Sequence, residues 1–273
     1  SEYEAFRAYA RLFPDACLLL VDTYDTLRSG VPNAIRVFDE LRAAGHEPKG
    51  IRLDSGDLAY LSKRAREMLD DAGYPNAIIC ASSDLDEYLI NSLKNQGAKI
   101  DLWGVGTKLI TSADMPALGG VYKLSALYPA EGGEIPKIKL SDNSDKITNP
   151  AFKDVYRIYD KKSGKAEADL IVVRGEVIDE SEPLTIFHPK ETWKRTTFTD
   201  YRVRPLTQQI LRGGELVRPL PSLAEICTYA EQEKESFWDE YKRPDNPHVY
   251  KVDLSQKLFD IKNKLISEIR SNG

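Results

Sequence analysis

Four short apolar runs in the first part of the chain each end in small or acidic residues and lead into a segment with helical character. The runs are residues 17–21, 49–53, 76–80 and 100–103, and apolar side chains recur at helical spacing after the first three. Consecutive strands joined by helices run parallel, with right-handed crossovers. The alternation therefore predicts an α/β fold with a parallel sheet.

After residue 115 the pattern changes to short apolar runs separated by turns, which is typical of antiparallel strands. These runs are residues 121–128, 135–140, 155–159, 170–173 and 184–187. Two helices are expected to close the chain, at about 222–241 and 254–271, and the second is strongly amphipathic. The link at residues 128–133 is the expected boundary, so the chain is divided into segments 1–128, 129–220 and 221–273.

The first residues already show helical spacing. Tyr3, Phe6, Ala10 and Phe13 fall on one helical face, and the chain has no initiator methionine. A helix is thus expected to be under way at residue 1. We expect this chain to be the C-terminal part of a longer polypeptide, with an amino-terminal segment that contributes to its function.

Composition argues against several classes of partner. The chain has 38 Lys and Arg against 43 Asp and Glu, a formal net charge of -5, and no lysine-arginine tract, so we expect neither nucleic acid nor a membrane surface. With 41% hydrophobic and 30% charged residues it is typical of a soluble globular protein. Its longest apolar run, residues 16–21, is far below the roughly 18 residues that span a bilayer. We expect a cytoplasmic location.

The cysteines and histidines do not indicate a metal site. Cys17, Cys80 and Cys227 are too scattered for a disulfide framework or a zinc site, and each is interpreted as a small buried hydrophobe. The three histidines are equally isolated, in segments that look like turns. We therefore expect neither zinc nor haem.

Polar residues follow each of the four runs. In a parallel sheet these positions share the rim at which ligands bind, beyond the carboxyl ends of the strands. After the fourth run, Gly104-Val105-Gly106-Thr107 offers backbone N–H groups and a hydroxyl that could cradle a phosphate. The alternative is that this segment is only a tight connection between strand and helix, since it lacks the full dinucleotide-binding pattern.

Arg52 and Asp54 form a more specific pattern. Residues two apart in a strand project from the same face, so the pair offers a guanidinium fork for phosphate and a carboxylate for hydroxyls or Mg²⁺. The alternative is that the two side chains only pair with each other, while Ser55 or Asp57 caps the following helix.

Further polar residues follow the first and third runs. Asp22 and Asp25 come after the first run, and Ser83 and Asp84 after the third. The aspartates can instead bond turn amides, and Ser83-x-x-Asp86 also fits a helix cap. Together with the arginine and the glycine loop, however, this rim suits a sugar phosphate with adjacent hydroxyls and a metal-bound diphosphate.

These same segments, in this order, resemble the nicotinate phosphoribosyltransferase family. The matching segments are Val21-Asp-Thr-Tyr-Asp-Thr26, Gly50-Ile-Arg-Leu-Asp-Ser-Gly-Asp57, Ala81-Ser-Ser-Asp-Leu-Asp-Glu87 and Trp103-Gly-Val-Gly-Thr107, with weaker likeness at 122–124 and 201–214. The resemblance runs over the whole chain and covers about the C-terminal half of a family member. The sister enzymes that act on nicotinamide differ around the arginine-aspartate motif, so the motif favours the nicotinate branch.

The resemblance implies a fold and a reaction. The fold is an irregular, partial TIM-like barrel of parallel strands, with an additional antiparallel β segment and C-terminal helices, in a homodimer. Segment 1–128 would be the barrel part with the phosphoribosyl pyrophosphate site, and 129–220 the β-rich remainder. The reaction joins nicotinate to 5-phosphoribosyl 1-pyrophosphate in NAD salvage, with Mg²⁺, and uses ATP through a phosphorylated histidine.

The resemblance also implies a role for each rim residue. The phosphate-binding residues are Gly104, Val105, Gly106 and Thr107. The other substrate-binding residues are Ser55, Gly56, Asp57, Ser83 and Asp84. In the catalytic group, Arg52 faces the diphosphate or the base, while Asp54 and Asp22 bind ribose hydroxyls, directly or through Mg²⁺. Family members often have glycine or asparagine where Ser83 stands.

The chemistry agrees with this inventory. Breaking the bond from the ribose to pyrophosphate develops oxocarbenium character, so catalysis needs charge neutralisation rather than a protein nucleophile. None of His46, His188 and His248 matches the motif of the phosphorylated histidine. Three alternatives stay open: a nicotinamide phosphoribosyltransferase, a phosphate-binding barrel enzyme that uses Lys108 as a Schiff-base lysine, and a non-catalytic nucleotide-binding fragment.

Overall fold

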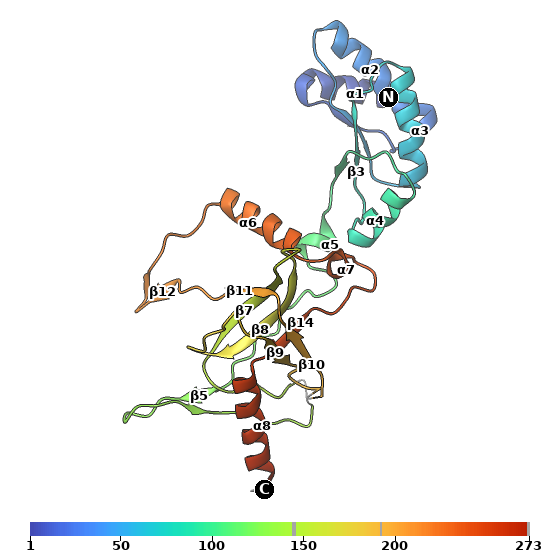
Figure 1. Cartoon of the computed structure of the whole chain (residues 1–273). Coiled ribbons are helices and arrows are strands. Elements are labelled where there is room, and N and C mark those ends of the chain that lie inside the picture. Colours follow the sequence, from blue (N-terminus) through green and yellow to red (C-terminus); the bar gives the residue numbers. More distant parts are fainter. Residues whose placement is uncertain (144–145, 192, 272–273) are drawn as a thin grey trace. The chain divides into compact units, whose positions relative to one another are not determined.

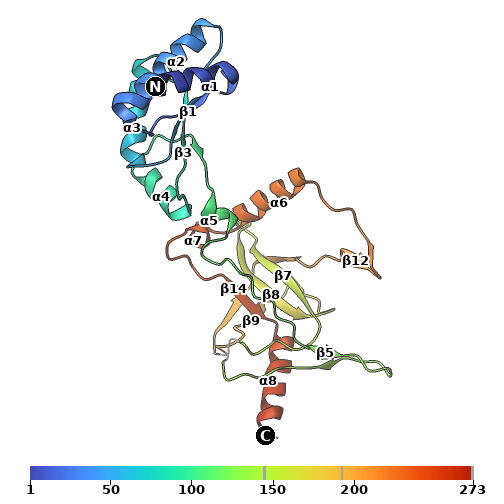
Figure 2. The same cartoon turned by 180° about the vertical axis from the view of Figure 1, so that it is seen from behind.

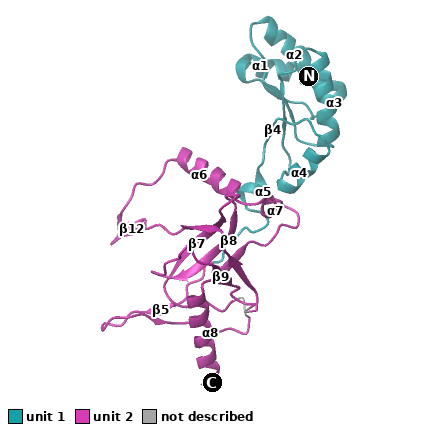
Figure 3. Ribbon diagram, in the orientation of Figure 1, with its two compact units in different colours: residues 1–119 teal, residues 120–273 magenta. Residues whose placement is uncertain are grey.

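The computed structural model describes residues 1–143, 146–191 and 193–271 (Figure 1). The chain forms two compact units, Ser1–Gly119 and Gly120–Gly273, which Figure 3 shows in different colours. Each unit has its own sheet and its own apolar core, and each is described by itself.

The first unit is built on a parallel sheet in the order β1-β2-β3-β4. Its strands are β1 (Leu18–Leu20), β2 (Gly50–Leu53), β3 (Ile78–Ala81) and β4 (Leu102–Trp103), and all three strand pairs are parallel. The helices are α1 (Glu2–Leu12), α2 (Val31–Ala43), α3 (Leu58–Asp71), α4 (Glu87–Asn95) and α5 (Thr107–Ile110), with short turns η1 (Pro14–Ala16) and η2 (Thr26–Gly30). The predicted parallel α/β arrangement is confirmed.

Aspartate side chains cap the start of three of these helical segments. The carboxylate of Asp57 accepts from the backbone N–H of Tyr60 at 2.9 Å and so caps α3. Asp25 opens η2 in the same way. The cap of α4 is Asp86, which accepts from Leu89 N at 2.8 Å. The helix therefore begins after Asp86, and Ser83 does not cap it, which removes the structural alternative offered for Ser83.

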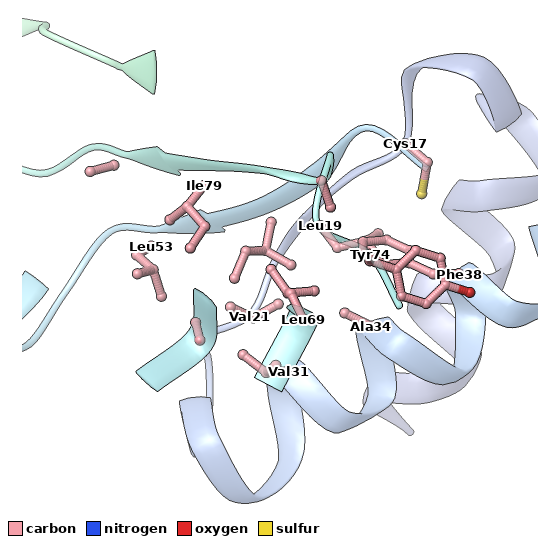
Figure 4. Packing of buried hydrophobic residues seen from close by; sticks show 14 of the residues in the cluster. Cys17, Leu19, Val21, Val31, Ala34, Phe38, Leu53, Leu69, Tyr74 and Ile79 are labelled. Atoms are coloured by element: carbon pink, nitrogen blue, oxygen red, sulfur yellow. The ribbon is translucent and has the colours of Figure 1, made fainter. Parts of the chain in front are cut away.

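The core of the first unit lies between the sheet and its helices (Figure 4). Leu19, Val21, Leu53 and Ile79 come from the strands or their ends, and Val31, Ala34, Phe38 and Leu69 come from α2 and α3. The rings of Phe38 and Tyr74 meet edge to face, with centroids 5.4 Å apart. Cys17 is fully buried in this core, as expected, and burial raises the pKa of its thiol to about 11.

One glycine brings a helix start close to the end of a strand. A Cβ built on Gly30 would lie 1.8 Å from the carbonyl oxygen of Val21, so no other residue fits there without a backbone shift. This close approach fixes the start of the loop that carries Asp22. The packing thus positions one part of the rim.

The second unit contains a six-stranded sheet in the order β10-β9-β14-β8-β7-β11. In chain order the strands are β7 (Lys153–Asp160), β8 (Ala166–Val173), β9 (Leu184–Phe187), β10 (Arg195–Phe198), β11 (Tyr201–Pro205) and β14 (Lys251–Leu254). All pairs are antiparallel except β14 with β8. Two hairpins, β5 (Ala126–Leu127) with β6 (Ile135–Pro136) and β12 (Leu211–Arg212) with β13 (Glu215–Leu216), stand outside this sheet.

Three helices belong to the second unit: α6 (Leu223–Ser236), α7 (Asp239–Lys242) and α8 (Gln256–Ser271). Figure 2 shows them from behind the view of Figure 1. α8 contacts β8 and β9, and its Leu258 is fully buried. α6 buries none of its residues, so Cys227 is exposed and its interpretation as a buried hydrophobe is wrong.

The structure differs from three expectations for this region. The expected last helix begins after Leu254, because residues 251–254 form β14, inserted between β8 and β9 with Leu254 opposite Ile171. This insertion joins the C-terminal residues to the sheet formed by residues 153–205, so the compact units number two, where three segments were expected. The strands expected at 121–128 and 135–140 shorten to the two-residue strands β5 and β6.

The described residues form a mixed α/β fold with a four-stranded parallel sheet, a six-stranded, largely antiparallel sheet and two hairpins. Among the described residues, β1 and β4 each pair with one strand only, so the parallel sheet is open rather than closed into a barrel. Over residues 1–143, 146–191 and 193–271, no helix has the length and apolar composition needed to cross a membrane.

Candidate functional site

The carboxyl ends of β1 and β2 are tied together by Asp22. One carboxylate oxygen of Asp22, Oδ2, accepts from the backbone N–H of Asp54 and from the hydroxyl of Ser55, both at 2.7 Å. Asp22 thus serves the structural role of bonding turn amides. It also places its carboxylate beside the Arg52–Asp54 motif, where the sequence predicts a binding residue.

Arg52, Asp54 and Ser82 form a hydrogen-bonded cluster at the end of β2 and β3. Arg52 Nη2 donates to Asp54 Oδ1 at 3.0 Å, and Arg52 Nε donates to Ser82 Oγ at 2.7 Å. The Ser82 hydroxyl in turn donates to Asp54 Oδ1. Arg52 and Asp54 therefore pair, as the structural alternative expects, but 46% of each side chain stays exposed and open to a ligand.

Asp54 is held as a carboxylate. The hydrogen bond from Ser82 is the largest cause that lowers its pKa below the usual range, followed among the favourable contacts by the bond from Arg52. An ionised Asp54 accepts hydrogen bonds from hydroxyls or binds a cation, as the proposed sugar phosphate requires.

The loop after β3 approaches Asp54 through its backbone. Ser83 has a φ of 107°, in the region that favours glycine, and its backbone N–H contributes to the lowered pKa of Asp54. Glycine adopts this conformation more readily than serine does. Both Ser83 and Asp84 are exposed, so their side chains are accessible to a ligand.

The segment from Gly104 to Thr107 lies beside this loop. Gly104 N donates to the carbonyl of Ala81 at 2.7 Å, and a Cβ on Gly104 would lie 3.3 Å from Ser82 Cβ. Within the described part of the chain, the N–H groups of Val105, Gly106 and Thr107 have no protein acceptor. α5 has only four residues, so its dipole is small, and an anion at this loop would be held by these N–H groups themselves.

The remaining residues of the predicted site lie at the start of α3. Ser55 bonds Asp22, while Asp57 caps the helix. Gly56, between them, has a φ of +77°, which turns the chain from the strand end into the helix. The side chain of Asp57 is thus used to cap α3, which is the structural alternative given for this residue.

Lys108 is held by an aspartate. Its ammonium pairs with Asp86, and this hydrogen bond raises the pKa of the lysine. A lysine that is protonated at neutral pH is a poor Schiff-base nucleophile, which weighs against the aldolase-like alternative. The pair stands at a pocket of about 360 Å³ that also contains Ile90, Val105 and Leu109.

The histidines have other partners. His46 Nδ1 lies 2.7 Å from Asp15, and His188 accepts from the backbone of Glu191 at 2.9 Å. In the part of the chain that the structure describes, three or more His, Cys, Asp or Glu residues nowhere gather closely enough to hold a metal ion.

Sequence reasoning missed Ser82. It follows a strand, as Ser83 does, but the choice between two adjacent serines depends on which one faces the end of β2. The pairing of β2 with β3, in which Leu53 lies opposite Ala81, decides this. Side chains alternate between the two faces of a strand, so Arg52 and Asp54 share a face. In the neighbouring strand, Cys80 lies opposite Arg52, and Ser82, two residues later, lies on that same face.

Comparison with known proteins connects this arrangement to a family. Residues 152–262 match the Nicotinate phosphoribosyltransferase C-terminal domain. Nicotinate phosphoribosyltransferase of Bacillus subtilis is 47% identical over 272 residues, which cover 99% of this chain and 54% of that protein. The chain belongs to the nicotinate phosphoribosyltransferase family.

Other family members agree, and they also define how much of a family member is present. The Dictyostelium discoideum nicotinate phosphoribosyltransferase is 39% identical over 97% of this chain and 46% of that protein. The crystal structure of human nicotinic acid phosphoribosyltransferase matches with a TM-score of 0.75 and 29% identity, over 97% of this chain and 50% of that one. The chain spans about half the length of the curated relatives it matches.

The fold extends beyond close relatives. The crystal structure of nicotinate-nucleotide pyrophosphorylase from Pyrococcus furiosus matches with a TM-score of 0.57 at 20% identity, over 87% of this chain and 51% of that chain. At this identity the match shows a shared fold alone. Because one fold can serve several functions, the function of this chain is inferred from the residues of the rim and not from the fold.

Proposed function

We propose that this chain supplies the phosphoribosyl-binding part of a nicotinate phosphoribosyltransferase. The reaction forms nicotinate mononucleotide and pyrophosphate from nicotinate and 5-phosphoribosyl 1-pyrophosphate, with ATP hydrolysis, in cytoplasmic NAD salvage. The observation that carries the proposal is the Arg52–Ser82–Asp54 cluster. It places a guanidinium and a carboxylate next to a loop with unbonded N–H groups, in a chain of this family.

The substrate's groups have matching partners on this rim. The N–H groups of residues 105–107 would receive the 5-phosphate, and the guanidinium of Arg52 would face the diphosphate or the base. Asp54 and Asp22 would accept from the ribose hydroxyls, directly or through Mg²⁺. Ser83 and Asp84, on the loop between β3 and α4, would lie near the ribose.

These residues can promote the reaction without a protein nucleophile, because the ring nitrogen of nicotinate forms the new bond to ribose C1 as the bond to pyrophosphate breaks. As the bond from ribose C1 to the pyrophosphate oxygen lengthens, positive charge grows on the ribose and negative charge on the leaving group. Arg52 stabilises the departing diphosphate, and the carboxylates of Asp54 and Asp22 hold the sugar in line.

The donor set fits Mg²⁺ delivered with the substrate. Magnesium in proteins usually binds one or two carboxylates together with substrate phosphates. Asp22 uses Oδ2 for two protein hydrogen bonds, so within the described residues its Oδ1 stays available to a cation. Asp54 is ionised, and 46% of its side chain is exposed to an approaching ion. When bound, the ion would neutralise diphosphate charge.

Half of a family member's length lies outside the matched region, and we assign to it the steps that this rim does not serve. These are base stacking, the phosphorylated histidine that couples ATP, and the strands that would complete a TIM-like barrel next to β1 and β4. A homodimer would complete the assembly. The described histidines with side-chain bonds, His46 and His188, are engaged in bonds away from the Arg52 cluster.

Replacing Asp54 tests the proposal directly. In the complete enzyme, we expect Asp54→Asn to weaken binding of Mg²⁺-phosphoribosyl pyrophosphate by roughly 1.5 to 3 kcal/mol, because a charged acceptor is lost. Isothermal titration measures this change. Asp71→Asn, at an exposed position of α3, is the matched control and should bind like the wild type. An unchanged dissociation constant in a folded Asp54→Asn protein would sink the assignment.

A substitution in the glycine loop tests the phosphate contact. Nothing lies within 4 Å of a Cβ built on Gly106, so Gly106→Val introduces no direct clash at Cβ. The backbone there, with φ −117° and ψ −107°, is one that valine disfavours, so the variant should lose some stability as well as crowd the loop that offers the N–H groups. We expect affinity for ribose 5-phosphate to fall about tenfold, the scale of a lost charged hydrogen bond, with little change for ribose.

The control is Gly119→Val, another position with nothing within 4 Å of the added Cβ. If Gly106→Val binds the two sugars with the wild-type ratio of affinities, the loop is only a turn. Binding of both by isothermal titration, with the melting temperature recorded for each variant, separates lost contact from lost stability.

A further inference from the structure

Ser82 is more deeply buried than the two rim residues whose side chains it contacts, Arg52 and Asp54. Only 7% of the residue is exposed, compared with 46% of the Arg52 and Asp54 side chains. Its backbone N–H donates to the carbonyl of Leu53 at 2.8 Å, which continues the pairing of β2 with β3. The backbone of Ser82 is thus fixed by the sheet.

The hydroxyl of Ser82 contacts both members of the pair at once. It accepts from Arg52 Nε at 2.7 Å and donates to Asp54 Oδ1. A hydroxyl has one proton to donate, and the other candidate acceptor, the Leu53 carbonyl, is more distant at 3.5 Å. The hydroxyl proton therefore points to Asp54, while the lone pairs face Arg52.

This geometry orients the exposed edges of both groups. Arg52 uses Nε and Nη2 for protein bonds, and within the described residues its Nη1 has no protein acceptor. Because the guanidinium is planar, fixing two of its nitrogens fixes the direction of the third. The long, half-exposed side chain would otherwise sample several rotamers.

We propose that Ser82 is a positioning residue that holds Arg52 and Asp54 together in the arrangement that receives phosphoribosyl pyrophosphate. This inference rests on the proposed function. Ser82 itself is buried beneath the pair, so it acts through Arg52 and Asp54 and does not touch the substrate.

The test is a double-mutant cycle in the complete enzyme. Ser82→Ala should raise the dissociation constant for Mg²⁺-phosphoribosyl pyrophosphate about tenfold, because hydrogen bonds to charged groups are among the stronger ones. In an Asp54→Asn background the same change should cost less than about threefold, since coupled residues are non-additive. Ser82→Thr, which keeps the hydroxyl, should bind more tightly than Ser82→Ala.

Ser62→Ala supplies the matched control for a lost buried serine. Ser62 is fully buried in α3, donates to the Ala59 carbonyl at 3.2 Å and accepts from Lys99 N at 3.1 Å. Its substitution should lower the melting temperature but leave the dissociation constant unchanged. Equal effects of Ser82→Ala in both backgrounds would overturn the positioning role.

A second measurement does not depend on the substrate. Arg52 Nε donates to Ser82 Oγ at 2.7 Å, so the Nε proton reports this contact directly. Nitrogen-15 NMR of the Arg52 Nε–H should show faster proton exchange with solvent in Ser82→Ala than in the wild type, because the hydroxyl that accepts this proton is lost. If the wild type binds no phosphoribosyl pyrophosphate but this exchange rate rises in the variant, the proposed function fails and the Ser82 contact stands. If binding is normal and the exchange rate is unchanged, the contact is refuted.

Discussion

Residues 1–273 alone should form no detectable nicotinate mononucleotide, whereas the chain combined with the rest of a family member's length should form it. The matched region covers only 54% and 46% of two curated relatives. Within the described residues, the outer strands of the parallel sheet leave apolar side chains exposed, Leu20 at 39% and Leu102 at 49%. Exposed strand edges of this kind promote association between chains.

The experiment expresses the chain with and without the complementary segment of a relative. We expect solubility and product formation to return together when the segment is present. Asp54→Asn in the co-expressed pair separates the two effects, because it should restore solubility while binding of phosphoribosyl pyrophosphate stays weak. If the chain alone is monomeric, folds cooperatively and makes product at a rate that the added segment does not change, the proposed division of roles is wrong.

Arg157→Ala should lower the free energy of unfolding by about 3 to 5 kcal/mol, the scale of a broken buried ion pair. Arg157, on β7, donates to both oxygens of Asp169 at 2.8 and 3.0 Å and to Glu233 of α6 at 3.0 Å. Only 12% of its side chain is exposed, and 14% of Asp169. Removing the guanidinium would leave the buried Asp169 without its main partner and Glu233 with Arg204 as its remaining arginine partner.

The loss should appear first where α6 meets the sheet. Trp238, which follows that helix and donates to Glu167 at 3.0 Å, gives a fluorescence signal close to the substitution. Urea unfolding of the complete protein measures the change. The control is Arg174→Ala, whose pair with Asp154 at 3.1 Å leaves 52% of the arginine side chain exposed and should contribute less than about 1 kcal/mol. A change of similar size in both variants would contradict the assigned role of Arg157.

Local patterns determined most of the first unit. Each parallel strand lies within or next to its predicted run, because alternation of apolar runs with helical periodicity is a property of neighbouring residues. The start of α3 could also be predicted from the sequence, since Asp57 was one of the two candidate caps. The identity of the cap of α4 could not, because Ser83 and Asp86 both fit the local pattern and the backbone at Ser83 decides between them.

Within the candidate site, the sequence identified the residue types but not their contacts. Arg52, Asp54 and Asp22 could be selected because they lie at or just after strand ends. That Asp22 bonds the backbone of Asp54, and that Ser82 joins Arg52 to Asp54, depends on strand pairing between residues about 30 positions apart. The functional roles of these residues stay predictions until binding is measured.

The sequence by itself determined the parallel α/β character of residues 16–107, the antiparallel character of the remainder and the family, because each depends on local periodicity or on contiguous motifs. Only the tertiary structure decided that residues 251–254 form a strand between β8 and β9. It also decided that Arg157 reaches Glu233, 76 positions away, and that Ser82 rather than Ser83 supports the rim. The physical reason is that a strand's partners and a buried side chain's contacts are set by packing between distant segments, which no local pattern encodes.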